Sequence, residues 1–131
     1  MSAPAELQQA VFQALSADPG VSALVGGRIH DQAPRQLQFP YITFGSTSIY
    51  DWSTGTESGT EQLFTLHVWS KTPGKKETLA IMDAVRDCLE HTPLSLTSRT
   101  LVDIALEFAE ARHDEDLEVN HGLLRYRAIS E

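Results

Sequence analysis

The sequence has few of the residues on which many catalytic, metal-binding and membrane-inserted proteins depend. Its 131 residues include one cysteine, Cys88, which excludes an intrachain disulfide and a zinc site built from paired cysteines. No apolar run approaches the roughly 18 residues that a membrane-spanning helix needs. The first residues, Met1–Glu6, have neither the basic start nor the apolar core of a signal peptide. We therefore expect a chain that stays in the compartment where it is made.

Basic residues are also scarce. Ten lysines and arginines stand against 18 aspartates and glutamates, for a net charge of −8. Binding to DNA or RNA independently of sequence requires a cationic surface that displaces counterions, so this balance argues against a nucleic-acid-binding protein. An acidic surface would, in contrast, suit a conduit through which DNA slides without sticking.

Motifs that would indicate catalysis are missing as well. No Gly-x-Ser-x-Gly elbow presents a serine, and neither Gly26-Gly27 nor Gly55 and Gly59 lead through a Gly-Lys-Ser/Thr step into a helix. Cys88 lies among apolar residues at helical spacing, as a buried structural cysteine would. We expect no enzymatic activity and no cofactor.

One group of residues does suggest a metal site. The metal-ligand types His113, Asp114, Asp116 and His121 flank a predicted hairpin turn, where they would face one another. The alternative is an ordinary acidic turn exposed to solvent, and this is the interpretation that we favour.

The periodicity of apolar residues predicts a single α+β domain over residues 1–131. Two main helices are expected, over about Pro4–Ser16 and Lys75–His91, with a short helical turn at Val21–Leu24. In the second main helix, the residues at helical spacing form one apolar stripe: Thr78, Ile81, Met82, Val85, Cys88 and Leu89.

Strand patterns occupy most of the remaining chain. We expect strands over Arg28–Asp31, Tyr41–Gly45, Glu61–Trp69, Leu94–Thr97, Leu101–Ala111 and Val119–Ile129, with a long loop over Thr47–Thr60. In Leu101–Ala111 the alternation places Val102, Ile104, Leu106 and Phe108 on one face. An antiparallel sheet with one buried face needs helices to cover it, so we predict both main helices on one face of an antiparallel sheet.

Six residues are candidates for contacts with other subunits or partners. His67 and Trp69 lie on the strand face opposite Phe64, Leu66 and Val68, which places them toward solvent or a partner unless the sheet curves and half-buries them. Trp52 is in the long polar loop. Leu79 lies off the apolar stripe of its helix, although one exposed leucine is common. Asp103 and Glu107 lie on the face of Leu101–Ala111 opposite its large apolar residues.

Several segments together resemble a family of small phage and prophage proteins. The similar positions are Ala14-Leu15, Asp18, Val21, Ala23 to Gly26, Arg28-Ile29, Pro34, Phe39 to Tyr41, Asp51-Trp52, His67 to Ser70, Gly74, Glu77, Ile81-Met82, Val85-Arg86, Leu89, His121-Gly122 and Leu124 to Tyr126. Each piece alone is a turn signal or a strand pattern. Their order and spacing over nearly the whole chain resemble the tail-terminator, or tail-completion, proteins of long-tailed phages, prophages and gene transfer agents.

This resemblance implies a structural role in a virion or phage-like particle assembled in the bacterial cytoplasm. Proteins of this kind form a ring, typically a hexamer, on the head-proximal end of the tail tube. The ring stops polymerisation of the tube and offers a surface to the head connector. The implied partners are other copies of the chain, the tail-tube protein and the head–tail connector protein, with DNA passing through the lumen and no membrane or specific nucleic acid bound.

Two alternatives remain open at the level of sequence. The chain could be a different component of the head–tail neck, such as a connector or head-completion protein. It could also be a small ligand-binding or enzymatic domain unrelated to virions. A closed ring requires a heterologous interface with two different patches on each subunit, for which the exposed Leu101–Ala111 segment is a candidate.

Overall fold

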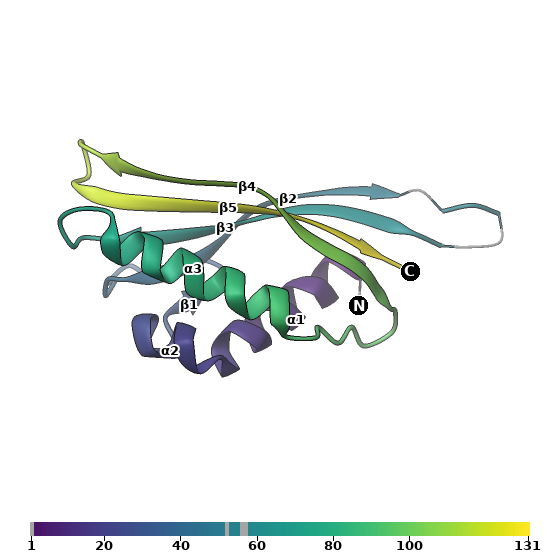
Figure 1. Cartoon of the computed structure of the whole chain (residues 1–131). Helices are drawn as coiled ribbons and strands as arrows, with labels where there is room; N and C mark the ends of the chain where they lie inside the picture. The colour runs from purple at the N-terminus through teal and green to yellow at the C-terminus, as the bar shows by residue number, and fades with distance from the viewer. Residues whose placement is uncertain (1, 52, 56–57) are drawn as a thin grey trace.

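The computed structural model describes residues 2–51, 53–55 and 58–131. Within these ranges the chain forms three helices and one five-stranded sheet (Figure 1). The elements in chain order are α1 (Ala3–Ala17), α2 (Pro19–Val25), β1 (Ile29–His30), β2 (Tyr41–Asp51), β3 (Thr60–Ser70), α3 (Lys76–His91), β4 (Leu101–Asp114) and β5 (Val119–Ser130).

The first two helices have clear local start and stop signals. The Ser2 hydroxyl accepts a hydrogen bond from the Ala5 N–H at 3.4 Å and caps α1. The Asp18 carboxylate accepts one from the Val21 N–H at 2.9 Å and caps α2, which begins with a proline. Gly26 ends α2 in the left-handed conformation, with φ of 58°, which glycine adopts without strain.

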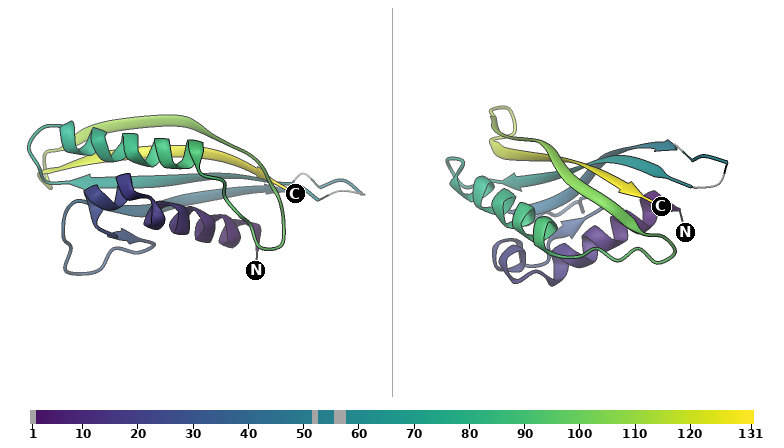
Figure 2. Two further views of the ribbon diagram at one scale, coloured as in Figure 1. Left: turned by 60° about the horizontal axis from the view of Figure 1, so that its bottom comes forward. Right: turned by 45° about the vertical axis from the view of Figure 1, so that its right-hand side comes forward.

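The helices form one layer and the sheet forms the other. All three helices cover one face of the sheet, and the opposite face has no covering layer in the described part of the chain (Figures 1 and 2). We call these the inner and the outer face. The predicted stripe of α3 is confirmed, because the same six residues are its buried ones. They pack against alternate residues of β3 and β5, including Leu66, Val68 and Leu124. The α+β class and the two main helices on one face are confirmed.

The strand order is β1-β2-β3-β5-β4. The four long strands pair antiparallel throughout, as predicted. The short β1 is an exception, since it pairs parallel to β2 through Ile29 with Ile42 and His30 with Thr43. Residues 31–40 return the chain to the same end of the sheet, which produces this parallel pair and makes the sheet mixed.

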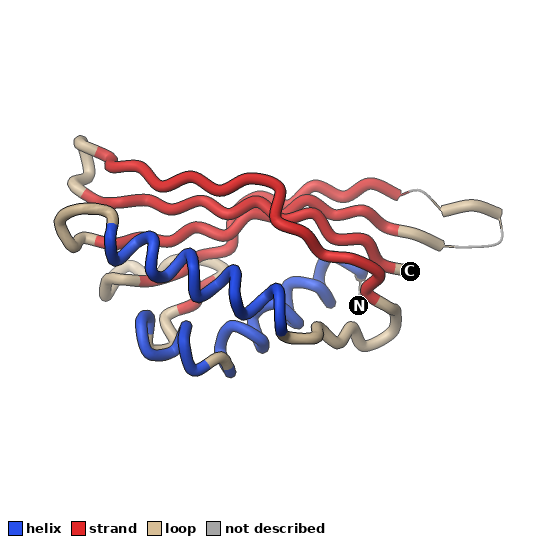
Figure 3. Tube along the Cα trace, in the orientation of Figure 1, coloured by secondary structure: helices blue, strands red, loops and turns tan. Residues whose placement is uncertain are grey.

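Two predictions about local structure were wrong. The stretch Thr47–Thr60 is not a long loop, because β2 continues to Asp51 and β3 begins at Thr60. The two strands form an arm that extends beyond the helices (Figure 3). One of its polar side-chain contacts crosses between the strands, since the Gln62 amide donates to the Thr47 hydroxyl at 2.8 Å. Residues 94–97 form no strand, and Leu94 and Leu96 instead pack on the core from an irregular segment.

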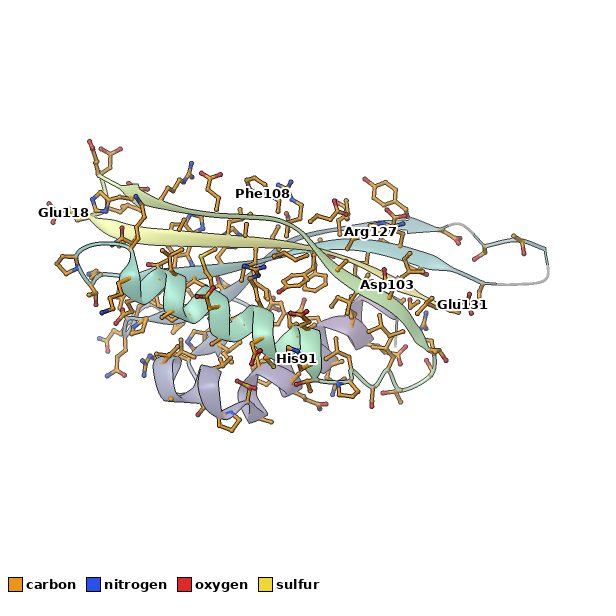
Figure 4. The ribbon with its side chains drawn as sticks, in the orientation of Figure 1. His91, Asp103, Phe108, Glu118, Arg127 and Glu131 are labelled. Atoms are coloured by element: carbon orange, nitrogen blue, oxygen red, sulfur yellow. The ribbon has the colours of Figure 1, made fainter. Side chains whose placement is uncertain are left out.

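The predicted alternation of Leu101–Ala111 was also wrong, because two bulges interrupt it. The pairing shifts between Leu101 and Asp103 and again between Leu106 and Phe108. Leu106 lies opposite the buried Tyr126, whereas Phe108 lies opposite the exposed Arg125 and is itself 43% exposed. The bulges therefore place Phe108 on the outer face. Figure 4 shows Phe108 pointing away from the helices.

Candidate interaction surfaces

Stacked rings occupy one part of the outer face. Trp69 stacks on His121 with ring centroids 4.1 Å apart and planes within 4°, and His67 stacks on His121 at 4.9 Å. His67 Nδ1 lies 2.6 Å from His121 Nε2, so one of these nitrogens donates a hydrogen bond to the other. The Trp69 indole donates to the Thr43 hydroxyl at 3.1 Å. The group is half-buried, and its hydrogen bonds fix the orientation of each ring.

Both histidines in this group favour the neutral state. Burial lowers the pKa of His67. For His121, burial first and then the positive charge that His67 would carry lower the pKa from 6.5 to about 4. His67 Nδ1 and His121 Nε2 are engaged with each other, so neither of these two nitrogens is available to a substrate. The arrangement is suited to packing and hydrogen bonding.

Gly45 allows β2 to pass close to the His67 ring of this stacked group. It lies at the β2 bulge, where Gly45 and Ser46 together face Thr65 of β3. A Cβ atom at this position would clash with the His67 ring and with the Thr65 hydroxyl. Glycine is therefore required for the close approach of β2 to the His67 ring.

The β2–β3 arm has apolar side chains on both faces. Ile49 on the inner face is 50% exposed and Tyr50 on the outer face is 54% exposed. Beside Tyr50 is a shallow depression lined by Leu63 and Ile129 and by the Arg127–Glu61 ion pair, whose N–O distance is 3.0 Å. An isolated hairpin with two apolar faces is unfavourable in water, so this arm has the character of a contact element.

Beyond the short β1, the edge of β2 adjoins an apolar groove. Within the described ranges, the pairing of β1 with β2 ends at Thr43. Past that point, Phe44 of β2 and Phe12 of α1 line a groove that also includes Ala5, Gln8, Gln9 and Asp31. Phe12 is 42% exposed. The backbone edge and the apolar groove lie side by side.

The opposite edge of the sheet is β4. In the part of the chain that the structure describes, β4 pairs only with β5. Val102 at the first bulge is 53% exposed, and Asp103, Glu107 and Glu110 give this edge an acidic character. The edge thus combines free backbone groups, apolar side chains and negative charge.

A hollow with polar lining residues lies between α3 and β4. It is lined by Arg86, Glu90 and Tyr126 together with apolar residues of β4. The Tyr126 hydroxyl is buried and has no hydrogen-bond partner among the described residues. Burial raises its pKa to about 12, so at neutral pH it remains a neutral hydroxyl.

The predicted site residues do not form one site. His67 and Trp69 lie together on the outer face, and Asp103 and Glu107 lie exposed on β4, with Glu107 at its second bulge. Leu79 is 46% exposed on α3, on the helical side of the molecule. Trp52 lies outside the described residues. Ile49, Tyr50 and Phe108 are exposed apolar residues that the sequence pattern does not indicate, and the pairing of His67 with His121 is likewise not visible in it.

The candidate metal cluster is separated by the fold. His113 lies opposite the buried Asn120, whereas His121 lies opposite Arg112 on the outer face. The two histidines therefore lie on different faces of the hairpin. Across residues 2–51, 53–55 and 58–131, no three histidine, cysteine, aspartate or glutamate side chains are close enough to hold an ion. Cys88 is buried, and burial raises its thiol pKa, as expected of a structural cysteine. No helix in these ranges is long and apolar enough to span a bilayer.

Comparison with known proteins connects this fold to phage tails. A family model described as "Tail completion protein gp17" matches residues 9–131. Tail completion protein gp17 of Bacillus phage SPP1 is 25% identical over 121 residues, which cover 92% of this chain and 89% of the relative.

Solved structures give the same result. A chain from the virion of a native gene transfer agent particle is 32% identical, with a TM-score of 0.87 over 95% of this chain and 94% of that chain. The structure of bacteriophage SPP1 gp17 protein shares the fold, with 23% identity and a TM-score of 0.68 over 96% of this chain and 89% of that chain. The resemblance inferred from the sequence is confirmed. Because the family model extends over nearly the whole chain, this protein belongs to the tail completion protein gp17 family.

Proposed function

We propose that this chain is a tail terminator of a phage or gene transfer agent particle. It forms a hexameric ring on the head-proximal end of the tail tube, stops polymerisation of the tube and joins it to the head connector. Its role is structural, without catalysis or a cofactor. The chain is made in the bacterial cytoplasm and becomes part of the particle.

The observation that carries this proposal is the likeness to a chain of a gene transfer agent virion. That likeness covers 95% of this chain with a TM-score of 0.87, so it extends over nearly the whole fold. Within its described residues, this chain has an arm, an open sheet face and two free stretches of sheet edge. These features expose apolar residues on opposite sides of one small domain. A closed ring needs two different patches on each subunit, and the two edges of the sheet supply them.

The predicted contact residues are assigned to different neighbours in this proposal. Asp103 and Glu107 lie on an edge of the sheet and belong to contacts between subunits. His67 and Trp69 on the outer face, Leu79 on α3, and Trp52 are assigned to contacts with adjacent subunits, the tail tube or the connector. Aromatic residues that are partly exposed and held rigidly commonly contribute much of the energy of an interface.

The acidic balance of the chain supports passage of DNA through the ring. A net charge of −8 per subunit would disfavour adsorption of the phosphate backbone. We therefore assign no specific nucleic-acid binding to this protein.

The test has two parts. Native mass spectrometry over a hundredfold range of concentration measures self-association, and a hexamer is the expected species. Cryo-electron microscopy of particles from the strain that encodes the chain should show its density at the head-proximal end of the tube. Density elsewhere in the neck would support a connector role instead. Absence of the protein from the particle would contradict the proposal, and a ligand-dependent rise in melting temperature across a metabolite panel would then favour a ligand-binding domain.

A further inference from the structure

The two edges of the sheet differ in how well they are protected against pairing. Between Gly45 and Tyr50, β2 has no charged residue and no proline, which are the usual features that prevent an exposed edge from pairing with another chain. The edge of β4 carries Asp103, Glu107 and Glu110, so two β4 edges facing each other would place like charges close together. Pairing of β4 with a second β4 is therefore disfavoured, while pairing of β4 with β2 meets no such repulsion.

Strand direction makes the two edges compatible. Each of the three junctions β2–β3, β3–β5 and β5–β4 is antiparallel. It follows that β2 and β4 of one chain run in opposite directions. When copies are related by rotation about an axis along the strands, β4 of one copy meets β2 of the next in antiparallel orientation. The sheet then continues from subunit to subunit with the same pairing that it has within each subunit.

The register across the sheet shows which residues would meet. Ala105 lies opposite Arg127, Arg127 opposite Leu63, and Leu63 opposite Ser48, so Ala105 and Ser48 are at one level of the sheet. By the same pairing, Ile104 is level with Ile49 and Leu106 with Thr47. In a ring whose axis runs along the strands, there is no rise from one subunit to the next, and residues at one level of the strands come opposite each other across the junction.

This alignment gives the exposed Ile49 an apolar cross-strand neighbour. Ile49 and Ile104 both belong to the inner face, where Ile104 already packs against the core. The same alignment places the small Ala109 level with Phe44, beside the groove that contains Phe12. Beyond the overlap, Glu110 comes level with His30 of β1.

We propose that the subunits associate by strand addition, in which residues 101–109 of β4 pair antiparallel with residues 44–51 of β2 on the next copy. The occupant of the β2 edge and its groove is thus a second copy of this chain. This pairing would be the subunit interface of the ring. That the ring forms on the tail tube rests on the proposed function. The β2–β3 arm provides most of the free edge, which gives the arm a specific role in assembly.

Cysteine cross-linking of the full-length chain tests this interface. Ser48 and Ala105 are exposed and lie on the outer face, three strand spacings apart within one chain. That separation is about 14 Å, so a bis-maleimide with a spacer much shorter than this distance cannot bridge them inside a subunit. The double variant Ser48→Cys/Ala105→Cys is compared with each single variant. The buried Cys88 is present in all of them and serves as the common background.

The proposal predicts a ladder of covalent oligomers from the double variant and only monomers from each single variant. Dimers from Ser48→Cys alone would show pairing of β2 with β2 and would overturn the proposal. Monomers from every variant in solution call for the same reaction within isolated particles. If the particle contains the chain but the double variant gives no ladder there, the interface is wrong while the proposed function stands. If the particle lacks the chain, the proposed function fails, and a ladder in solution would still support the interface.

Discussion

Glu6 is a carboxylate on the first turn of α1 that is only 2% exposed. It accepts hydrogen bonds from the Ser98 N–H at 2.6 Å, the Ser98 hydroxyl at 2.8 Å and Arg99 Nε at 2.7 Å. The Ser98 backbone bond is the largest of the effects that lower the Glu6 pKa from 4.5 to about 2, and burial opposes it. Glu6 thus fixes the irregular segment before β4 onto α1, in the ionised state.

A lowered carboxyl pKa in the folded state makes stability depend on pH in one direction. The contribution of Glu6 is fully present above about 4.5 and is lost as the pH falls toward about 2. We expect Glu6→Gln to lower the urea midpoint at pH 6, and the difference from the native chain to shrink between pH 4.5 and 2. Glu115→Gln, in the exposed turn between β4 and β5, should leave the midpoint unchanged. A difference for Glu6→Gln that stays constant with pH would contradict the assignment.

The histidine pair predicts a second dependence at higher pH. Because the pKa of His121 is lowered from 6.5 to about 4, its contribution is present above 6.5 and is lost as the pH falls toward 4. The charged groups that influence it are His67, Arg112, Asp114 and Glu110. In His121→Gln the loss of stability between pH 6.5 and 4.5 should be smaller than in the native chain. Titration of the imidazole signals by NMR checks the cause, and an unshifted His121 would contradict it.

At the scale of elements, Gly122 sets the distance between α3 and β5. A Cβ atom at this position would lie 2.7 Å from Met82 Sδ and 3.1 Å from Thr78 Cγ2. We expect Gly122→Ala to destabilise the fold by about 1–3 kcal/mol, because the added methyl group overpacks the contact between helix and sheet. Gly55→Ala is a matched control, since its Cβ would meet nothing within 4 Å. Thermal unfolding of both variants measures the difference, and equal melting temperatures would show that α3 moves away without cost.

The elements that were predictable from the sequence are those with local signals. The spacing of Ile81, Met82 and Val85 along one helix identifies its buried face without knowledge of any other segment. The alternation along β3 likewise placed His67 and Trp69 correctly on the outer face. The partner of His67 could not be predicted in this way, because His121 lies 54 residues later in the chain.

Other errors came from interactions that sequence patterns do not encode. Two bulges in β4 reverse the face of Phe108, and a bulge is decided by pairing with β5 and not by the alternation of β4 itself. The serine-rich sequence of the arm predicts a loop. It forms strands because cross-strand pairing decides the outcome there, and local propensity does not show that pairing. Strand order could not be predicted from the sequence pattern either, because it depends on nonlocal contacts.

At the scale of the whole molecule, the arm is the element on which the proposed assembly depends. Ile49 is half exposed, so Ile49→Lys should leave the melting temperature of the isolated subunit nearly unchanged. A lysine there puts a charge beside Ile104 on the inner face in place of an apolar neighbour, which opposes strand addition. We therefore expect loss of the oligomer in native mass spectrometry and, in particles, tails of uneven length that lack heads.

Leu117→Lys is the matched control for this variant, because Leu117 is 65% exposed but lies in the turn between β4 and β5, away from both pairing segments. It removes a comparable apolar side chain and adds the same charge. Intact oligomers and normal tails in Leu117→Lys, together with their loss in Ile49→Lys, would assign assembly to the free edge of the arm. Equal loss in both variants would instead indicate that added positive charge disturbs the particle in general. Normal tails in both would show that the particle terminates its tube without the edge of β2.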